Sequence, residues 1–462
     1  MPSTTDDPST SPPLLAPLAT LAPASAARTW MTAPHPSLPL VATASSDKTV
    51  RVYSLATFSL ASTVAGGHKR SVRACAWKPA GNGNSGGMAE SVLATGSFDA
   101  SAGVWRRWEG GGGSGAGGTT GGGAMEVDVA AGDDEEEEDE EWRFSVILDG
   151  HESEIKSVAW SAGGQFLATC SRDKSVWVWE EVEDDNFETI AVLQEHEADV
   201  KCVVWHPAED LLASASYDDT IRLYREDVDD WTAVACITGH EATVWCVDFE
   251  AVEVSGLRVE EEGGEGEGAA LSEERKAERA RWLQERVASG SRLVSCSDDL
   301  TVRVWKMKPK DGGAAQGAAG RNGMPSILRT SSIEEEWVQE AVLPRRHGRA
   351  IYSVSWSKKS GLIASTGSDG KIVVYKEQWR RESSDATVPR PADGDGAAEG
   401  QKEEAQPLTE WVVVAEVEGA HDVFEINHVT WALRRDKGRK SEDEEVIIST
   451  GDDGEAKLWT LP

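Results

Sequence analysis

Short apolar runs, separated by turn residues, recur along most of the chain. Residues 195–224 carry the pattern most clearly, because they contain VKCVVW, then LLASAS, then the turn residues YDD, and then the alternating run TIRLY. Runs of this length, rich in β-branched residues and bounded by turn residues, predict β-strands. A fourth run, WTAVACI at 231–237, precedes the next Gly-His pair. The pattern therefore predicts a unit of four consecutive strands.

The four-strand unit recurs seven times, and each copy carries an aspartate at its turn. The aspartates are Asp47, Asp99, Asp173, Asp218, Asp299, Asp369 and Asp453. A hydroxyl lies four residues before each aspartate, at Thr43, Thr95, Thr169, Ser214, Ser295, Ser365 and Ser449. An aromatic lies six residues after it, at Tyr53, Trp105, Trp179, Tyr224, Trp305, Tyr375 and Trp459. Upstream, six copies carry a histidine that precedes another aromatic. The interval is nine residues for His68, His151, His196, His240 and His347, and ten residues for His421. In the first copy, Ser25 stands in place of the histidine and Pro34 in place of the aromatic.

The spacing of the copies predicts the fold class. His151, His196 and His240 are 45 and 44 residues apart, which is typical of the four-stranded blade of a β-propeller. One blade cannot bury both faces of its sheet, whereas seven blades packed radially can, so we expect an all-β, seven-bladed propeller. The last copy ends after its third strand, and residues 14–21 are placed to supply the missing outer strand and close the ring. Pro17 fits this assignment only at an outermost edge.

The repeated polar residues resemble catalytic groups when one copy is taken alone. In seven copies they are more economically a buried network, in which the aspartate accepts hydrogen bonds from the histidine and the turn backbone. The hydroxyl joins this network, and the indole N–H or the tyrosine hydroxyl closes it. We therefore expect a protein that is not an enzyme, without catalytic, cofactor-binding or metal-binding residues.

Segments of biased composition interrupt the repeat. We assign residues 13–462 to a single propeller and residues 1–12 to a disordered N-terminus. The inserted loops are expected at 106–142 (Gly-rich, then acidic), 251–290, 307–335 and 380–409. The stretch 271–290, which splits the fifth copy between its first two strands, has helix-forming composition and ends on Gly290. These loops are read as tolerated surface expansions, with a docking arm as the alternative.

Charge and cysteine content exclude several classes of partner. The net charge of −34 argues against DNA or an anionic membrane as the main partner, because phosphates require a basic surface. Much of the acidity is concentrated at 132–141, 260–268 and 441–445, which is typical of loops. The six cysteines lie in apolar runs without C-x-x-C spacing, so we expect buried thiols in a reducing compartment. No signal peptide or long apolar run is recognised, so we expect a soluble intracellular protein.

One face of the predicted ring is a candidate partner-binding surface. Propeller partners commonly dock on the narrow face, whose residues precede the turn aspartate or follow the repeat histidine by five positions. The candidates at these positions are Arg172, Arg73, Lys156, Lys201, Phe98, Tyr217, Trp245, Tyr352 and Trp30. Exposed basic and aromatic residues are typical interface anchors, and an acidic or aromatic-bearing peptide would suit them. The alternative is ordinary surface, with the charges paired to Glu154 and Asp199.

The sequence resembles WD40-repeat proteins over essentially its whole length. Over about three blades it more closely resembles the WD40 subunit of the cytosolic iron–sulfur protein assembly machinery. This resemblance rests on GHESEIKSVAWSAGGQFLATCSRDKSVWVWE (150–180), LQEHEADVKCVVWHPAEDLLASASYDDTIRLY (193–224), GHEATVWCVDF (239–249) and SDDLTVRVWK (297–306). The weak first copy and the long insertions depart from the family's compact members.

The resemblance implies a scaffold of the targeting complex that helps to place [4Fe–4S] clusters into cytosolic and nuclear apoproteins. Its implied partners are a small acidic assembly factor, a HEAT-repeat adaptor, a hydrogenase-like carrier and apoprotein clients, with the chain a monomer within the hetero-complex. It implies the cytoplasm as location, with the nucleus as a second one, and a functional role for Arg172 in the SRDKS motif. The alternative is a WD40 adaptor of another complex, such as a ubiquitin-ligase receptor or a chromatin subunit. Leu223-Tyr224-Arg225 resembles a co-chaperone recognition tripeptide, although Tyr224 is also a repeat aromatic.

Overall fold

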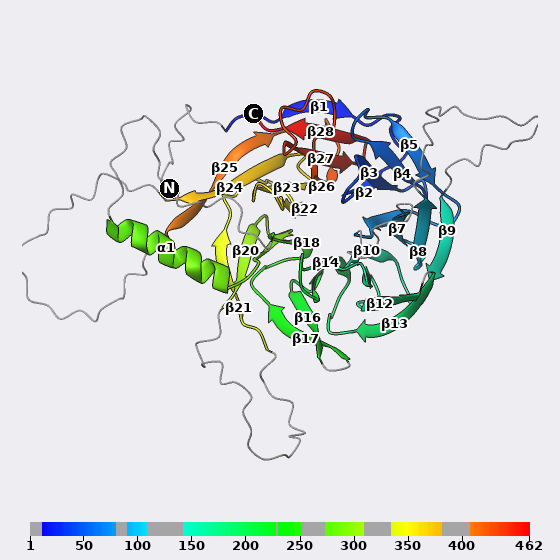
Figure 1. Ribbon diagram of the computed structural model, residues 1–462, viewed down its shortest axis with the longest axis horizontal. Coiled ribbons are helices and arrows are strands. Elements are labelled where there is room, and N and C mark those ends of the chain that lie inside the picture. The colour runs from blue at the N-terminus through cyan, green and yellow to red at the C-terminus, as the bar shows by residue number, and fades with distance from the viewer. Residues whose placement is uncertain are drawn as a thin grey trace, which may run out of the picture.

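The computed structural model of the protein is a closed ring of seven antiparallel sheets (Figure 1). It describes residues 12–79, 90–108, 142–183, 185–227, 230–251, 273–308, 334–380 and 407–462. Within these ranges each sheet has four strands, and the seven sheets stand radially around one axis. The prediction of an all-β, seven-bladed propeller is confirmed.

The blades follow one another in chain order, with the first strand of each next to the axis. Blade 1 contains β2 (Thr29–Pro34), β3 (Leu40–Ser45), β4 (Val50–Ser54) and β5 (Leu60–Val64), and blade 2 contains β6 (Val72–Trp77), β7 (Glu90–Ser97), β8 (Ala102–Trp108) and β9 (Arg143–Leu148). Blade 3 contains β10 (Ile155–Trp160), β11 (Phe166–Ser171), β12 (Val176–Glu183) and β13 (Asn186–Leu193), and blade 4 contains β14 (Val200–Trp205), β15 (Leu211–Ser216), β16 (Ile221–Asp227) and β17 (Asp230–Ile237). Blade 5 contains β18 (Val244–Phe249), β19 (Leu293–Ser297), β20 (Val302–Met307) and β21 (Trp337–Val342), and blade 6 contains β22 (Ile351–Trp356), β23 (Ile363–Gly367), β24 (Ile372–Trp379) and β25 (Thr409–Val417). Blade 7 contains β26 (Ile426–Leu433), β27 (Glu445–Gly451), β28 (Ala456–Thr460) and, as its outer strand, β1 (Ala16–Thr20).

The N-terminal segment closes the ring, as the sequence predicted. β1 pairs antiparallel with β28, and Pro17 lies opposite Trp459. We call residues 13–25 the N-terminal strap, because they also bridge to both neighbouring blades. The Leu15 amide donates to the Glu416 carbonyl of blade 6 at 3.2 Å, and the Ala22 amide donates to the Phe58 carbonyl of blade 1 at 3.1 Å. The strap therefore connects blades 6, 7 and 1 across the point where the ring closes.

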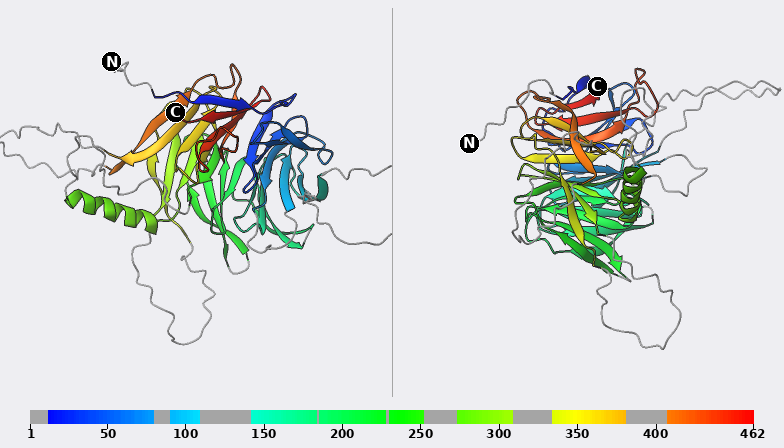
Figure 2. Two further views of the ribbon diagram at one scale, coloured as in Figure 1. Left: turned by 45° about the horizontal axis from the view of Figure 1, so that its top comes forward. Right: turned by 90° about the vertical axis from the view of Figure 1, so that its left-hand side faces the viewer.

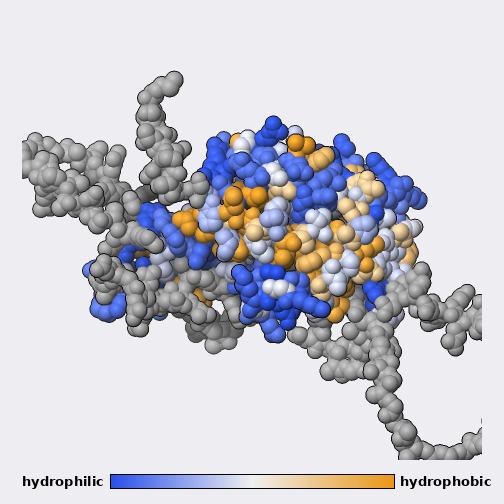
Figure 3. All heavy atoms as spheres, turned by 90° about the horizontal axis from the view of Figure 1, so that it is seen from above, coloured by the Kyte–Doolittle hydropathy of each residue, from blue (hydrophilic) through white to orange (hydrophobic). Residues whose placement is uncertain are grey.

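The strap forms an outer edge that is apolar but poorly suited to pairing. Leu14 is 71% exposed, and Ala16 and Pro17 are also exposed. Hydrophobic residues are interspersed with hydrophilic ones over this rim, which Figure 3 views from above β1. Pro17 lacks an N–H group, so it blunts the free edge of β1 against further strand addition.

The core consists of layers between adjacent blades. In the layer between blades 3 and 4, Trp205 and Val203 of β14 pack with Phe166 and Cys170 of β11. Equivalent apolar clusters lie between the other blades. Each sheet is thus buried on both faces, which explains the fully buried second strands such as β15.

The two faces of the ring differ in how they are connected. The top face carries the turns between second and third strands and the connections between blades, whereas the bottom face carries the first-to-second and third-to-fourth connections. Seven internal stretches lie outside the described residues: 80–89, 109–141, 184, 228–229, 252–272, 309–333 and 381–406. Each connects the first to the second strand of a blade, or the third to the fourth, and so belongs to the bottom face. The top face is therefore described in full.

The predicted insertions largely fall outside the described residues, as do residues 1–11 of the predicted N-terminal tail. At its start, the predicted insertion 106–142 overlaps a strand, since β8 continues to Trp108. The helix predicted within 271–290 is α1 (Glu273–Ala288), which lies beside blades 5 and 6 (Figures 1 and 2). No helix among the described residues is long and apolar enough to cross a membrane.

A buried ionic cluster fixes α1 to the ring. The Arg292 guanidinium contacts Glu250 at 3.0 Å, Glu340 at 2.8 Å and Glu377 at 2.7 Å. Arg286 of α1 also pairs with Glu250. Arg286 and Arg292 are 3% and 2% exposed, so this cluster joins the helix to blades 5 and 6 in the protein interior.

Candidate functional site

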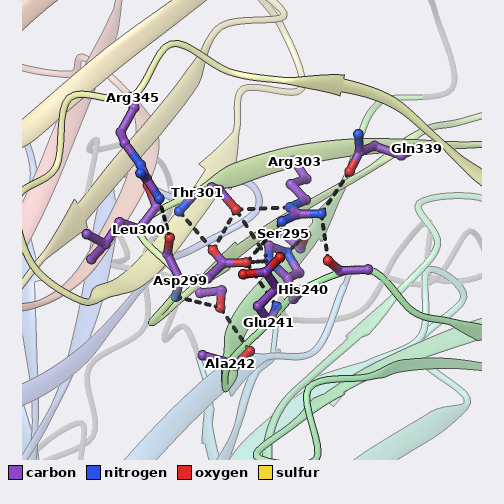
Figure 4. A network of polar contacts seen from close by, with 12 residues as sticks. His240, Glu241, Ala242, Ser295, Asp299, Leu300, Thr301, Arg303, Gln339 and Arg345 are labelled. Carbon is purple, nitrogen blue, oxygen red and sulfur yellow. Dashed lines mark hydrogen bonds and ion pairs between the residues drawn. The ribbon is translucent and has the colours of Figure 1, made fainter. Parts of the chain in front are cut away.

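The repeat histidine, hydroxyl, aspartate and tryptophan form a chain of hydrogen bonds, and Figure 4 shows its histidine, serine and aspartate in blade 5. The Trp305 indole donates to the Ser295 hydroxyl at 2.7 Å, and that hydroxyl bonds His240 Nε2 at 2.7 Å. His240 Nδ1 lies 2.7 Å from Asp299 Oδ2, and the Thr301 hydroxyl donates to the same carboxylate at 2.6 Å. Because a carboxylate only accepts, Nδ1 carries the proton and Nε2 accepts from the serine. Every polar atom of this chain is thus used internally.

The same chain recurs in the other blades with small variations. The histidine Nδ1–aspartate distance is 2.8 Å in blades 3, 4 and 7, 3.1 Å in blade 6 and 3.5 Å in blade 2. Indole N–H donors close it at Trp105, Trp179 and Trp459. The network therefore belongs to the fold, because its polar groups bond one another within each blade.

The prediction that a tyrosine hydroxyl closes the chain is wrong for Tyr53, which donates to the Pro23 carbonyl at 2.7 Å instead. The buried Tyr224 hydroxyl makes no hydrogen bond of acceptable geometry among the described residues. A phenol hydroxyl lies at the far end of its ring, whereas an indole N–H lies on the side, so the two reach different places. In blade 1, Ser25 replaces the histidine and donates to Asp47 at 3.1 Å, and Arg51 neutralises that aspartate at 2.9 Å.

Buried and half-buried histidines are expected to make the stability of the ring sensitive to mild acid. Burial lowers the pKa of His35 to about 4 and that of His428 to about 3, and burial also lowers the pKa of His240. Above about pH 4, His35 and His428 stay neutral in the folded protein, whereas in the unfolded chain they take up a proton below their ordinary pKa of 6.5. The unfolded state then binds more protons, so the free energy of unfolding falls as pH decreases below 6.5.

We expect urea unfolding to give a constant free energy between pH 7 and pH 8 and a decline between pH 6.5 and pH 4.5. Each histidine that stays neutral when folded contributes about 1.4 kcal/mol of loss for each pH unit. A His428→Gln variant, which removes the most strongly shifted group, should flatten the decline by one such contribution. Equal free energies for the wild type at pH 7 and pH 5 would contradict the expectation.

β-Bulges position the predicted partner-binding residues. Each first strand has a register shift that skips one residue, as at Lys156 between Ile155 and Ser157, five positions after His151. The same shift skips Trp30, Arg73, Lys201, Trp245 and Tyr352. A bulge leaves its extra residue unpaired and redirects the side chain. The ring thereby presents these side chains together at the top-face mouth of the axis.

Cations and aromatic rings alternate around this mouth. We call Trp30, Arg73, Phe98, Lys156, Lys201, Tyr217, Trp245 and Tyr352 the cation–aromatic belt. On one side, Arg73 lies 4.9 Å from the Trp30 ring, Trp30 lies 5.8 Å from Phe98, and Lys156 lies 4.6 Å from Phe98. These contacts fall within the range of cation–π attraction and join three consecutive blades.

The other side of the belt continues across blades 4 to 6. Lys201 lies 5.2 Å from the Tyr217 ring and 5.1 Å from the Trp245 ring, and Trp245 packs edge-on against Tyr352 at 5.0 Å. Arg172 stands outside the belt with its side chain 58% exposed, 4.0 Å from both Glu154 and Asp199. The structure thus brings eight of the nine predicted residues into two contacting groups of four, and Arg172 lies beside them at the limit of ion pairing with Glu154 and Asp199.

The charges of the belt are unequally balanced. Lys156 pairs with Glu154 at 2.5 Å and Lys201 with Asp199 at 3.2 Å, so these two lysines have the internal partners that the sequence suggested as an alternative. No carboxylate of the described residues pairs with Arg73, whose Nη1 donates only weakly to the Trp30 carbonyl at 3.4 Å. Burial lowers the pKa of Arg73 to about 10, so it stays charged. An incoming anionic group would find an uncompensated cation here.

Sequence reasoning missed several residues of the top face. Arg28 stacks on Trp30 at 4.8 Å and pairs with Asp452 at 2.6 Å, and the missing histidine of the first copy hid its position. Val423 and Phe424 form an apolar tip that is 93% and 45% exposed. The only sequence signal for this tip was the longer spacing from His421 to its aromatic.

Other sequence candidates are placed as follows. Leu223 and Tyr224 are fully buried in β16, so the Leu-Tyr-Arg tripeptide is inaccessible in the folded ring. The expectation of buried thiols is wrong for Cys236, which is exposed on β17, while Cys202 and Cys246 are half-buried. In the described part of the chain, no three His, Cys, Asp or Glu side chains group as a metal site.

Comparison with known proteins places the chain among named relatives. A family model described as "WD domain, G-beta repeat" matches residues 23–54, 59–106, 142–180, 187–225, 287–306 and 339–376. The chain is 61% identical over 455 residues to "Probable cytosolic iron-sulfur protein assembly protein 1" of Phaeosphaeria nodorum, covering 97% of this chain and 96% of the relative. It is 54% identical over 453 residues to the protein of the same name from Aspergillus terreus, covering 96% and 97%.

Proposed function

The chain belongs to the WD40-repeat family of cytosolic iron–sulfur protein assembly protein 1, and we propose that it is a non-catalytic scaffold of that assembly. In this role it helps to deliver [4Fe–4S] clusters to cytosolic and nuclear apoproteins by holding other proteins on its top face. The observation that carries the proposal is the cation–aromatic belt. The relatives' name supports a site of action in the cytosol, and the nucleus is a further part of the proposal.

The construction of the top face supports docking there. The belt residues stand on first strands and short turns that the repeat networks hold in place. A docking surface built on rigid elements loses little conformational entropy on binding, which favours affinity. The rigid top face is therefore a candidate surface for partner binding.

The belt chemistry indicates the kind of segment it would hold. Arg73 and Arg172 offer positive charge in a chain of net charge −34, and exposed Tyr217 offers an aromatic contact. An acidic segment that carries an aromatic side chain would complement both features. We propose that such segments come from the small acidic assembly factor, the HEAT-repeat adaptor, the hydrogenase-like carrier or apoprotein clients.

Reversing one exposed charge tests this surface. We expect Arg172→Glu to fold normally, because the Arg172 side chain makes only contacts of 4.0 Å, and to weaken partner binding by about 2 kcal/mol, or ~30-fold. In cells depleted of the native protein, this variant should restore cytosolic [4Fe–4S] enzyme activity poorly while mitochondrial [4Fe–4S] enzymes stay active.

The matched control is Lys437→Glu, which reverses an exposed charge on the bottom face between β26 and β27. It should restore activity like the wild type. Unfolding of Arg172→Glu would make Arg172 structural, and full activity of that variant would remove the top face from the proposal. If depletion itself left cytosolic iron–sulfur enzymes active, a WD40 adaptor of another complex would be favoured instead.

A further inference from the structure

Two cysteines of adjacent blades meet beneath the cation–aromatic belt. Cys202 of β14 and Cys246 of β18 both follow a bulge residue, and their Sγ atoms are 4.0 Å apart. These strands are the innermost of blades 4 and 5 and lie side by side near the axis (Figure 1). Both cysteines are half-buried, in contrast to the fully buried Cys75, Cys170 and Cys296.

We propose that Cys202 and Cys246 form a two-coordinate binding site for a soft monovalent cation, Cu(I). Thiolates are the protein ligands that soft metal ions prefer. A linear S–Cu–S unit with bonds of ~2.2 Å spans ~4.4 Å, which is close to the sulfur–sulfur distance in the structure. That distance is 4.0 Å, so the ligands are nearly in position before the ion binds.

The residue that directly follows the bulge of a first strand is a cysteine in blades 4 and 5. The equivalent positions of the other five blades hold Met31, Ala74, Ser157, Ser353 and His428. Among these seven positions, only those of blades 4 and 5 place two thiols next to each other. The sulfur atoms presently make weak contacts with carbonyl groups, at 3.5 Å from Cys246 to Val354 and 3.8 Å from Cys202 to Val247. Little is lost when such contacts are exchanged for metal bonds.

Arg73 is the nearby cation that favours the loaded site, whereas the neighbouring Cys202 thiol and burial raise the pKa of Cys246 and oppose its ionisation. Binding converts two thiols and one Cu(I) ion into a bis-thiolate complex of charge −1, and two protons leave to solvent. Burial lowers the pKa of Arg73, whereas negative charge on Cys202 and Cys246 would raise that pKa. The Arg73 guanidinium is therefore close enough to interact electrostatically with both sulfur atoms. Because Arg73 lacks a carboxylate partner among the described residues, it is available to stabilise the anionic complex. This inference is independent of the proposed scaffold function.

Competition with a Cu(I) chelator tests the site in the full chain. The reduced protein is titrated anaerobically with Cu(I) in the presence of bicinchoninate, and we expect one equivalent to be retained. Cys202→Ser and Cys246→Ser should each bind Cu(I) at least about 100-fold more weakly. Losing a residue that binds the metal costs no less affinity than losing a residue that only orients such a ligand. Cys236→Ser removes an exposed thiol on β17 and should bind like the wild type. X-ray absorption should give two sulfur neighbours at ~2.2 Å.

Several results would overturn the proposal. Retention of one equivalent by both Cys202→Ser and Cys246→Ser would place the ion elsewhere, as would loss of binding in Cys236→Ser alone. A first shell with nitrogen or three sulfurs would exclude the two-thiolate site. Circular dichroism and thermal unfolding of each variant exclude global unfolding as the cause of lost binding. Where serine disturbs the fold, the alanine variants at the same positions replace it.

Discussion

Removal of residues 1–22 is expected to abolish the cooperative unfolding transition of the ring. The deletion takes away β1, leaves the edge of β28 unpaired, and removes the backbone bonds to blades 6 and 1. It also removes Leu15 and Leu21, which are 3% and 1% exposed. An open propeller exposes strand edges and the faces of its terminal blades, so the truncated chain should also aggregate.

The matched control for this deletion is removal of residues 1–11, which leaves every described strap contact in place. Thermal unfolding followed by circular dichroism and by light scattering should separate the two proteins. A milder variant, Leu21→Ala, should lose about 2–5 kcal/mol of unfolding free energy, as buried leucines do. A single cooperative transition at the wild-type temperature in the longer deletion would show that the strap is dispensable for closure.

Replacement of Arg292 by methionine is expected to cost about 3–5 kcal/mol of unfolding free energy. Arg292 is the shared partner of Glu250, Glu340 and Glu377, and it also lies 5.1 Å from the Trp356 ring. Its removal leaves Glu377, which is 9% exposed, without its cation in the protein interior. Breaking a buried ion pair from one side is costly because the remaining charge is desolvated but uncompensated.

An exposed ion pair supplies the comparison for Arg292. Lys308 lies 3.2 Å from Glu336 with both side chains more than half exposed, so Lys308→Met should cost less than about 1 kcal/mol. Adding Glu377→Gln to Arg292→Met should recover part of the loss, since it removes the stranded charge. Urea unfolding of the variants measures these differences, and equal losses for Arg292→Met and Lys308→Met would contradict the assigned role of the cluster.

The sequence alone determined the architecture of the ring. The seven-fold spacing of His, hydroxyl, Asp and aromatic predicted the blades, and the truncated last copy predicted closure by the N-terminal strand. These features are readable because they are periodic, and a periodic signal survives the variation of single copies, as Ser25 shows in the first blade. Most of the belt was found in the same way, since its members hold equivalent repeat positions.

Only the tertiary structure decided how those residues interact across blades. Among the described residues Arg73 has no carboxylate partner while Lys156 and Lys201 are paired, and this difference depends on which side chains neighbouring blades bring near. The meeting of Cys202 with Cys246, and of Arg292 with Glu377 85 residues away, is likewise set by contact between blades. A repeat pattern describes each blade separately, whereas pairing, burial and charge balance depend on distances between blades that local sequence does not encode.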